Sequence, residues 1–212
     1  MMLIGQYDSP FVRRVGIALS TYGMAFEHRP WSTFGDVEKV AAYSPLRRVP
    51  TLVLDDGSAV VDSLAILMVI DDLIGPERAV LARRGADGRA LMRLCGFAAG
   101  VADKGVSLVY ERVLREQALP MWVGRCRAQV IETLDLLEGE RAGRGTTWLF
   151  DGALSHADVI LAAMWSFITE ALAAEFDWSR WPALSAHAAA CEALPVFSQV
   201  RQRFSGPAKA EA

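Results

Sequence analysis

Ser9 and Pro10 are the first neighbouring residues in the chain whose types and spacing could serve chemistry. Serine before proline is typical of a helix start, because the serine caps backbone N–H groups and proline fits the first helical position. The same geometry offers N–H groups and a partial positive charge to an anion. A thiol held there, with the serine hydroxyl donating to its sulfur, would ionise below its usual pKa of about 8.5. Taken alone, the pair favours capping, and anion stabilisation is the alternative.

Two further pairs could bind a small zwitterionic ligand. Val49-Pro50 enters an apolar run, where proline indicates either an edge strand or a cis peptide bond at a tight turn. Such a turn would expose the Val49 backbone to an extended ligand, which would pair with it like an added strand. Asp62-Ser63 is typical of a capped helix start. Alternatively, Ser63 binds a carboxylate at the helix N-terminus while Asp62 binds an ammonium group.

The tetrapeptide Ser155-His156-Ala157-Asp158 precedes the most apolar stretch of the chain. Serine followed three residues later by an acid indicates a capping box, in which each side chain satisfies a backbone N–H group of the other residue. We interpret it as a folding device and predict no catalytic role for it.

The elements that must position these residues differ between the two parts of the chain. In the first part, short strand and helix patterns alternate, and the Asp55-Asp56-Gly57 turn predicts a hairpin. We expect the first two strands to be parallel, because a helix links them, and the last two to be antiparallel. The predicted elements are strands at 3–7 and 25–29, helices at 10–22 and 37–43, hairpin strands at 48–54 and 59–61, and a helix at 64–74.

The rest of the chain shows helical patterns only. We predict helices at 89–118, 121–142, 155–173, 183–192 and 196–204. The predicted organisation is a domain at 1–75, a linker rich in Gly, Arg and Pro at 76–88, a helical domain at 89–205 and a disordered tail at 206–212.

Composition narrows the functional classes. The 212 residues are 52% apolar and 22% charged, with a net charge of -3 and no basic stripe, so nucleic acid is an unlikely partner. The apolar stretch at 159–168 is shorter than the roughly 20 residues that span a bilayer, so we expect a buried helix and no membrane partner. The three cysteines have no metal-ligand spacing, and no secretory signal is visible; we expect a cytoplasmic protein without a metal.

Four strings occur in an order that resembles the cytosolic glutathione transferases: YDSPFVRRVGIAL, SPLRRVPTLVLDDG, VVDSLAI and LSHADVILA. The first string is most similar to bacterial, serine-type members that begin with a strand and an SPF-type motif. The resemblance implies an α/β domain of the thioredoxin-like type, ordered βαβ-α-ββα, followed by an all-helical C-terminal bundle. It also implies glutathione as co-substrate and a homodimer.

The resemblance assigns roles to matching residues. Ser9 would be the catalytic hydroxyl, and Val49 would pair its backbone with the cysteinyl part of glutathione, ahead of a cis Pro50. Asp62 and Ser63 would bind the γ-glutamyl end. Arg48 would lie near the glycyl carboxylate of glutathione. A solvated position on the protein surface is an equal alternative for Arg48.

Two positions leave alternatives open. Tyr7 could rival Ser9, because some relatives use a phenol near the end of the first strand. Asp103 resembles acidic residues that reach the partner subunit's glutathione, although a solvated or capping role is favoured. The pair Leu46-Arg47 lacks the glycine often found in related loops, so the loop near the glycyl end is bulkier.

The predicted reaction is transfer of the glutathione thiolate to a small apolar electrophile in a cleft between the domains. The alternatives are a glutathione-dependent isomerase or dehalogenase, and a non-catalytic interaction protein on the same scaffold. The joint presence of the glutathione-binding residues argues against the non-catalytic protein. Apolar and aromatic side chains could line the electrophile pocket, with core packing as their alternative fate: Phe11, Phe97, Val101, Tyr110, Trp122 and Trp165.

Overall fold

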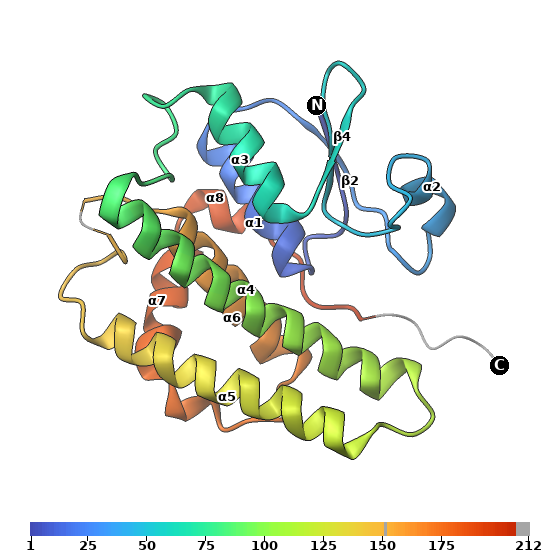
Figure 1. Ribbon diagram of the computed structural model, residues 1–212, viewed down its shortest axis with the longest axis vertical. Helices are drawn as coiled ribbons and strands as arrows, with labels where there is room; N and C mark the ends of the chain where they lie inside the picture. The colour runs from blue at the N-terminus through green and yellow to red at the C-terminus, as the bar shows by residue number, and fades with distance from the viewer. Residues whose placement is uncertain (151, 207–212) are drawn as a thin grey trace.

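The computed structural model describes residues 1–150 and 152–206, and Figure 1 shows its two parts. The N-terminal part consists of β1 (Met2–Ile4), α1 (Pro10–Thr21), β2 (Glu27–Arg29), α2 (Val37–Ala41), β3 (Thr51–Val53), β4 (Ala59–Val61) and α3 (Ser63–Ile74). The C-terminal part consists of α4 (Gly85–Leu114), α5 (Pro120–Ala142), α6 (His156–Ala171), the 3-10 turn η1 (Trp178–Arg180), α7 (Pro182–Glu192) and α8 (Pro195–Ser198).

The four strands form one sheet in the order β2-β1-β3-β4. β1 and β2 are parallel, whereas β1–β3 and β3–β4 are antiparallel. This arrangement confirms the predicted order βαβ-α-ββα and the predicted strand directions. The N-terminal part is therefore a small mixed sheet of the thioredoxin-like type.

Helices cover both faces of the sheet. Successive residues of a strand point to opposite faces, so β1 and β3 each contribute apolar side chains to both helix layers. Leu3 and Leu52 are paired across β1 and β3 and join the core formed with α1 and α3. Ile4 and Val53 point the other way and pack with Val40 of α2. Figure 1 shows the same arrangement, with α1 and α3 on one side of the strands and α2 on the other.

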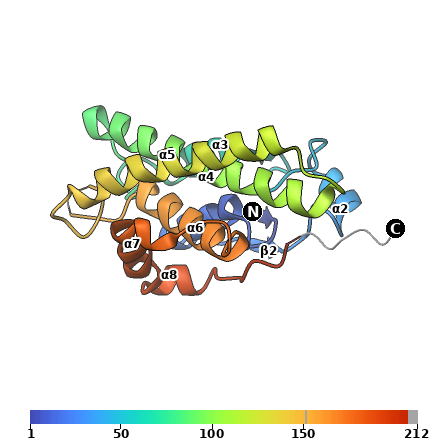
Figure 2. The same cartoon turned by 90° about the horizontal axis from the view of Figure 1, so that it is seen from below.

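The C-terminal part is a bundle around α6, which packs against α4, α1 and α7. Figure 2 shows α6 lying between α4 and α7. The apolar run at 159–168 is buried almost throughout, which confirms a core helix. No helix within residues 1–150 and 152–206 combines the length and the apolar composition that crossing a lipid bilayer requires.

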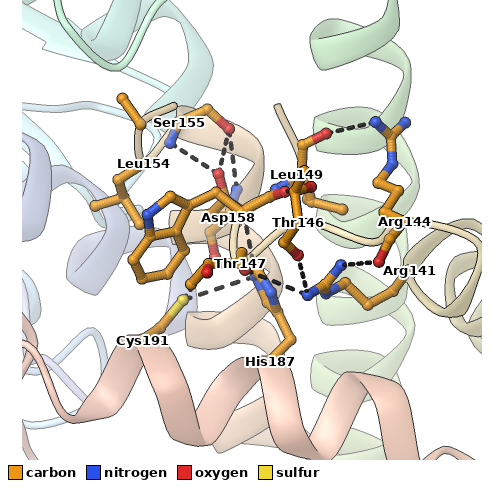
Figure 3. A network of polar contacts seen from close by, with 12 residues as sticks. Arg141, Arg144, Thr146, Thr147, Leu149, Leu154, Ser155, Asp158, His187 and Cys191 are labelled. Atoms are coloured by element: carbon orange, nitrogen blue, oxygen red, sulfur yellow. Dashed lines mark hydrogen bonds and ion pairs between the residues drawn. The ribbon is translucent and has the colours of Figure 1, made fainter. Parts of the chain in front are cut away.

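A buried polar network fixes the start of α6 (Figure 3). The backbone N–H of Ser155 donates to Asp158 Oδ2 at 2.8 Å, and Asp158 N–H donates to Ser155 Oγ at 3.4 Å, so the predicted capping box is present. Asp158 also accepts from Leu149 N–H at 2.8 Å. His187 Nε2 lies 3.3 Å from the same carboxylate, which joins α7 to the cap.

Polar contacts also join the two parts of the chain. Arg13 of α1 is almost fully buried and makes a bidentate ion pair with Glu192 of α7, at 2.6 and 2.7 Å. The Tyr22 hydroxyl donates to Asp71, and His156 Nε2 lies 3.0 Å from the same carboxylate. The domains are therefore packed as one unit through α1, α3, α6 and α7.

Several predicted boundaries were wrong: the first strand ends at Ile4 rather than at residue 7, and the helix predicted at 89–118 ends at Leu114. The predicted linker at 76–88 is too long, because α4 begins at Gly85 rather than at residue 89. The predicted helix at 196–204 ends at Ser198, and residues 201–204 are not helical; the Phe204 N–H, which a helix would bond internally, donates to Glu170 instead. Residues 207–212 of the predicted disordered tail lie outside the described residues.

Candidate functional site

Three segments with predicted site residues leave the same end of the sheet. Ile4 pairs with Thr51, and Thr51 pairs with Val61. The chain after β1, the chain before β3 and the chain after β4 therefore lie side by side. These segments carry Ser9, Val49-Pro50 and Asp62-Ser63, respectively.

The sheet end is tightly packed around Gly5, which has φ +130°. A Cβ atom at Gly5 would lie 2.8 Å from Val49 Cβ and 2.5 Å from Val12 Cγ2. A glycine is required here because no side chain fits between the strand end, α1 and Val49. The close approach places Val49 directly against the loop that leads to Ser9. The Val49-Pro50 peptide bond is cis.

Ser9 is the N-cap of α1 and is half-buried. Its Oγ atom accepts from Val12 N–H at 3.4 Å, so its O–H group can still donate to a ligand. Capping and anion stabilisation are therefore compatible, since one uses the oxygen lone pair and the other the proton. The first turn of α1 adds its partial positive charge at the same place.

Ser9 lines a cavity of about 600 Å³ between the two parts of the chain. Arg48 and Val49 lie on the same wall, and Asp103 and Tyr110 of α4 face them. Aromatic side chains supply much of the remaining surface: Phe11, Trp31, Phe34, Phe167 and Phe204. The cavity can hold a polar ligand near Ser9 and an apolar one against the aromatic residues.

Only some of the predicted electrophile-pocket residues line the described cavity. Phe11 and Tyr110 line the cavity. Val101 and Trp165 do not belong to its described lining, because both are buried in the helical core, where Trp165 packs edge-on against Trp178 at 5.8 Å. Phe97 and Trp122 also pack against that core. Val101 and Trp165 are therefore core residues, whereas Phe97 and Trp122 are partly buried at the edge of the core.

Sequence reasoning missed several cavity residues. Phe34 lies in the loop after β2, and its ring packs edge-on against Tyr110 at 5.6 Å. Trp31 in the same loop and Phe167 on α6 were also missed. An aromatic pair in the polar segment Trp-Ser-Thr-Phe-Gly was the available signal, because such residues rarely lie in a solvated loop without a packing partner.

Asp62 and Ser63 are not among the described lining residues of the cavity, but they follow β4 at the same end of the sheet as Ser9 and Val49. Asp62 has φ +72°, and its carboxylate accepts from Leu64 N–H at 2.8 Å, so it caps α3. Ser63 is the first residue of α3 and is buried. Both residues therefore hold the helix N-terminus that the sequence predicted.

Arg14 was not foreseen as a site residue, yet it lies behind Ser63. Its Nη1 atom is 3.5 Å from Ser63 Oγ, and the side chain is almost fully buried. Its Nε and Nη2 atoms have no hydrogen-bond partner among the described residues. Burial lowers the pKa of the Arg14 guanidinium, which is the expected direction for a cation removed from water. The Arg14 guanidinium, with N–H groups that have no partner among the described residues, therefore lies behind the N-terminus of α3.

Tyr7 is not among the described lining residues of the cavity. Its ring stacks on His28 at 3.9 Å and lies where a Cβ atom on Gly16 would be 2.7 Å from it. Burial raises the pKa of the Tyr7 phenol to about 12, so this group is neutral at physiological pH. The geometry favours Ser9 over Tyr7 as the hydroxyl next to a bound anion.

Charged side chains flank the cavity on both sides. Arg47 and Arg48 are exposed, and Arg47 forms an ion pair with Glu38 at 3.6 Å. Arg47 has φ +51°, a conformation that favours glycine over residues with a side chain. Asp103 pairs with Lys104 at 2.9 Å and is half-exposed.

Two family models match the chain: the glutathione S-transferase N-terminal domain at residues 3–78 and the glutathione S-transferase C-terminal domain at residues 120–190. The uncharacterized GST-like protein YibF of Escherichia coli is 32% identical over 170 residues, which cover 77% of each chain. Maleylacetoacetate isomerase of Pseudomonas aeruginosa is 26% identical over 209 residues, 94% of each chain.

Solved structures have the same fold. A glutathione S-transferase of Methylobacterium radiotolerans in complex with glutathione sulfonate has a TM-score of 0.86 and 24% identity, covering 96% of this chain and 97% of its own. One from Methylobacillus flagellatus with glutathione bound has a TM-score of 0.84 and 24% identity, covering 94% and 98%. The family models, the YibF relative and the fold together show that the chain belongs to the glutathione S-transferase family.

Proposed function

We propose that this chain is a glutathione transferase in which Ser9 stabilises the glutathione thiolate for attack on a small apolar electrophile. The observation that carries the proposal is the placement of the Ser9 hydroxyl at the N-terminus of α1 and on the wall of the cavity. Two structures of the same fold, one with glutathione sulfonate and one with glutathione bound, support the choice of ligand.

Thiolate stabilisation requires a modest free energy. Lowering the pKa of a thiol by two units from about 8.5 corresponds to about 2.7 kcal/mol. A hydrogen bond to a charged group contributes about 1.5–3 kcal/mol, and a helix N-terminus adds up to about 1 kcal/mol. The contributions of Ser9 and of the first turn of α1 are therefore large enough to lower the thiol pKa by two units, and the proposal requires no metal and no covalent intermediate.

The other ends of glutathione fit the neighbouring segments. In this proposal the Val49 backbone, ahead of Pro50, pairs with the cysteinyl part. The γ-glutamyl carboxylate binds at Ser63, where the N-terminus of α3 and Arg14 supply positive charge, and Asp62 faces the ammonium group. Arg48 lies at the cavity edge, where it can meet the glycyl carboxylate.

The electrophile would occupy the aromatic part of the cavity, next to Phe11 and Tyr110. A flat or apolar molecule suits this surface, because the rings offer area for burial and stacking. A second reaction also has support: the relative from Pseudomonas aeruginosa is a maleylacetoacetate isomerase and matches 94% of the chain. In a glutathione-dependent isomerase, the same thiolate would add to the substrate and leave again, so glutathione would be regenerated.

We also propose a cytoplasmic homodimer, as the family resemblance implies. Leu64 and Met68 of α3 are exposed one helical turn apart, which suits burial against a second copy. Half-exposed Asp103 could then reach the glutathione of the partner subunit. Three buried cysteines, unpaired in the described part of the chain, fit a reducing compartment.

Calorimetry with glutathione and turnover of a chlorinated aromatic substrate test the proposal together. We expect heat of binding at millimolar glutathione or below, and a coloured or chromatographically resolved conjugate. Product analysis separates transfer from isomerisation, because only transfer consumes glutathione. Absence of both binding and turnover in the folded protein would refute the proposal and favour a non-catalytic role.

A further inference from the structure

The segment 201–205 follows α8 and crosses the loop in front of Ser9; we name it the C-terminal strap. The Oε1 atom of Gln202 accepts from Tyr7 N–H at 3.1 Å. The Ser205 hydroxyl and backbone N–H both donate to Asp8 Oδ2, at 2.9 and 3.3 Å. Figure 1 shows this last described segment passing close to the start of α1. The strap therefore holds the two residues that directly precede Ser9.

The strap is also anchored to the helical part of the chain. Arg201 pairs with Glu170 of α6, and the backbone N–H of Phe204 donates to the same carboxylate at 2.8 Å. The ring of Phe204 packs edge-on against Phe167 at 5.6 Å. Since Glu170 and Phe167 both lie on the buried helix α6, the strap has a rigid base on one side and the β1–α1 loop on the other.

The same segment forms part of the cavity. Phe204 and Phe167 line it from the helical side, and Asp8 and Ser9 line it from the other. A molecule bound in the aromatic part of the cavity would thus contact a side chain of the strap. One short segment then joins the electrophile wall to the loop that aims the Ser9 hydroxyl.

We propose that the C-terminal strap positions Ser9 for thiolate stabilisation, with Gln202 and Ser205 as positioning residues. This inference rests on the proposed function. The loop needs an outside support because Ser9 must aim one O–H at the sulfur, and small misplacements of such groups are costly. The Asp8 carboxylate adds a second reason: it lines the cavity and would repel a thiolate if it turned inward. The two donors of Ser205 hold it on the strap instead.

The test compares Gln202→Leu/Ser205→Ala with Ser205→Thr and Ser198→Ala. Ser205→Thr keeps the donor to Asp8, and Ser198 is an exposed serine of α8 whose hydroxyl donates to Pro195 O at 3.0 Å. We expect the double variant to lower kcat about fivefold to tenfold, with KM for glutathione changed less than about twofold. The ultraviolet absorbance of the bound thiolate should fall with it, and amide exchange at Tyr7 should accelerate. Both single variants should behave like the unmodified protein.

Two results would overturn the inference while leaving the proposed function intact: an active parent protein whose double variant keeps kcat and thiolate absorbance, or a double variant that loses thermal stability and glutathione affinity in the same proportion as kcat. The latter would assign the strap a purely structural role. A parent protein that neither binds glutathione nor turns over would instead refute the proposed function, and this inference with it.

Discussion

The Nη1 atom of Arg14 lies 3.5 Å from the Oγ atom of Ser63, and this contact joins the interior of α1 to the first residue of α3. A buried guanidinium with spare donors is costly unless an anion shares its environment. The N-terminus of α3 is where the γ-glutamyl carboxylate would lie. Binding of this carboxylate would therefore offset part of the desolvation cost of the buried Arg14 charge.

Arg14→Met should weaken glutathione binding about tenfold, equivalent to about 1.4 kcal/mol, because it removes the positive charge behind Ser63. The free energy of unfolding without glutathione should change little or rise, since a buried, incompletely paired charge is replaced by an apolar side chain. Calorimetry and urea unfolding measure the two quantities. Arg93→Met, at a half-exposed position of α4, is the matched control. Undiminished affinity in Arg14→Met would contradict the role given to Arg14.

Gly5→Ala should destabilise the protein by about 2 kcal/mol or more and reduce glutathione affinity. The added Cβ would lie 2.5 Å from Val12 and 2.8 Å from Val49, so the Val49 turn must move. Gly57→Ala is the matched control: Gly57 also has a positive φ, of +84°, but nothing lies within 4 Å of its Cβ position. It therefore carries the backbone strain without the clash. Equal losses in both variants would show that packing at Val49 is not the cause.

Tyr22→Phe should lower the free energy of unfolding by about 1.5–3 kcal/mol, because the Tyr22 hydroxyl donates to the Asp71 carboxylate at the contact between α1, α3 and α6. Denaturant unfolding, monitored by tryptophan fluorescence, provides the measurement. Turnover at saturating substrate should be retained, since Tyr22, Asp71 and His156 are not among the described lining residues of the cavity. A loss of kcat with an unchanged free energy of unfolding would contradict this prediction.

Burial lowers the pKa of His187 from its usual 6.5, and this effect exceeds the upward influence of Asp158. The unfolded chain therefore binds a proton at His187 more readily than the folded chain, and the free energy of unfolding should fall as pH drops below 6.5. Between about pH 6.5 and 5 this residue would account for up to about 2 kcal/mol. Urea unfolding of the parent protein and of His187→Gln measures it: the variant should be less stable at neutral pH but lose less stability on acidification. Parallel pH profiles would contradict the assignment.

Local signals made much of the fold and part of the site predictable. Ser9-Pro10, Asp62-Ser63 and the 155–158 box each specify a helix start through contacts within a few residues, and all three starts are present. The hairpin after Pro50 follows from its turn residues in the same way. These predictions succeeded because neighbours along the chain determine the geometry.

The electrophile wall was harder to predict, because it depends on which face of each helix meets the sheet. Val101 of α4 and Trp165 of α6 carry the apolar character expected of a pocket, but both side chains face the helical core. The helical pattern at 196–204 includes Phe204, yet Phe204 lies outside any helix and its backbone N–H donates to Glu170 of α6. Arg14 has no local signal, because only the packing of α1 against α3 brings it to Ser63.

The central claim is that Ser9 keeps bound glutathione ionised, and ultraviolet titration of the thiol in the protein–glutathione complex tests it most directly. We predict a pKa at least one unit below the usual value of about 8.5 for the parent protein. In Ser9→Ala the pKa should rise toward that value, while kcat falls about tenfold to a hundredfold and glutathione remains bound. A thiol that titrates at the same pH in the parent protein and in Ser9→Ala would contradict the claim.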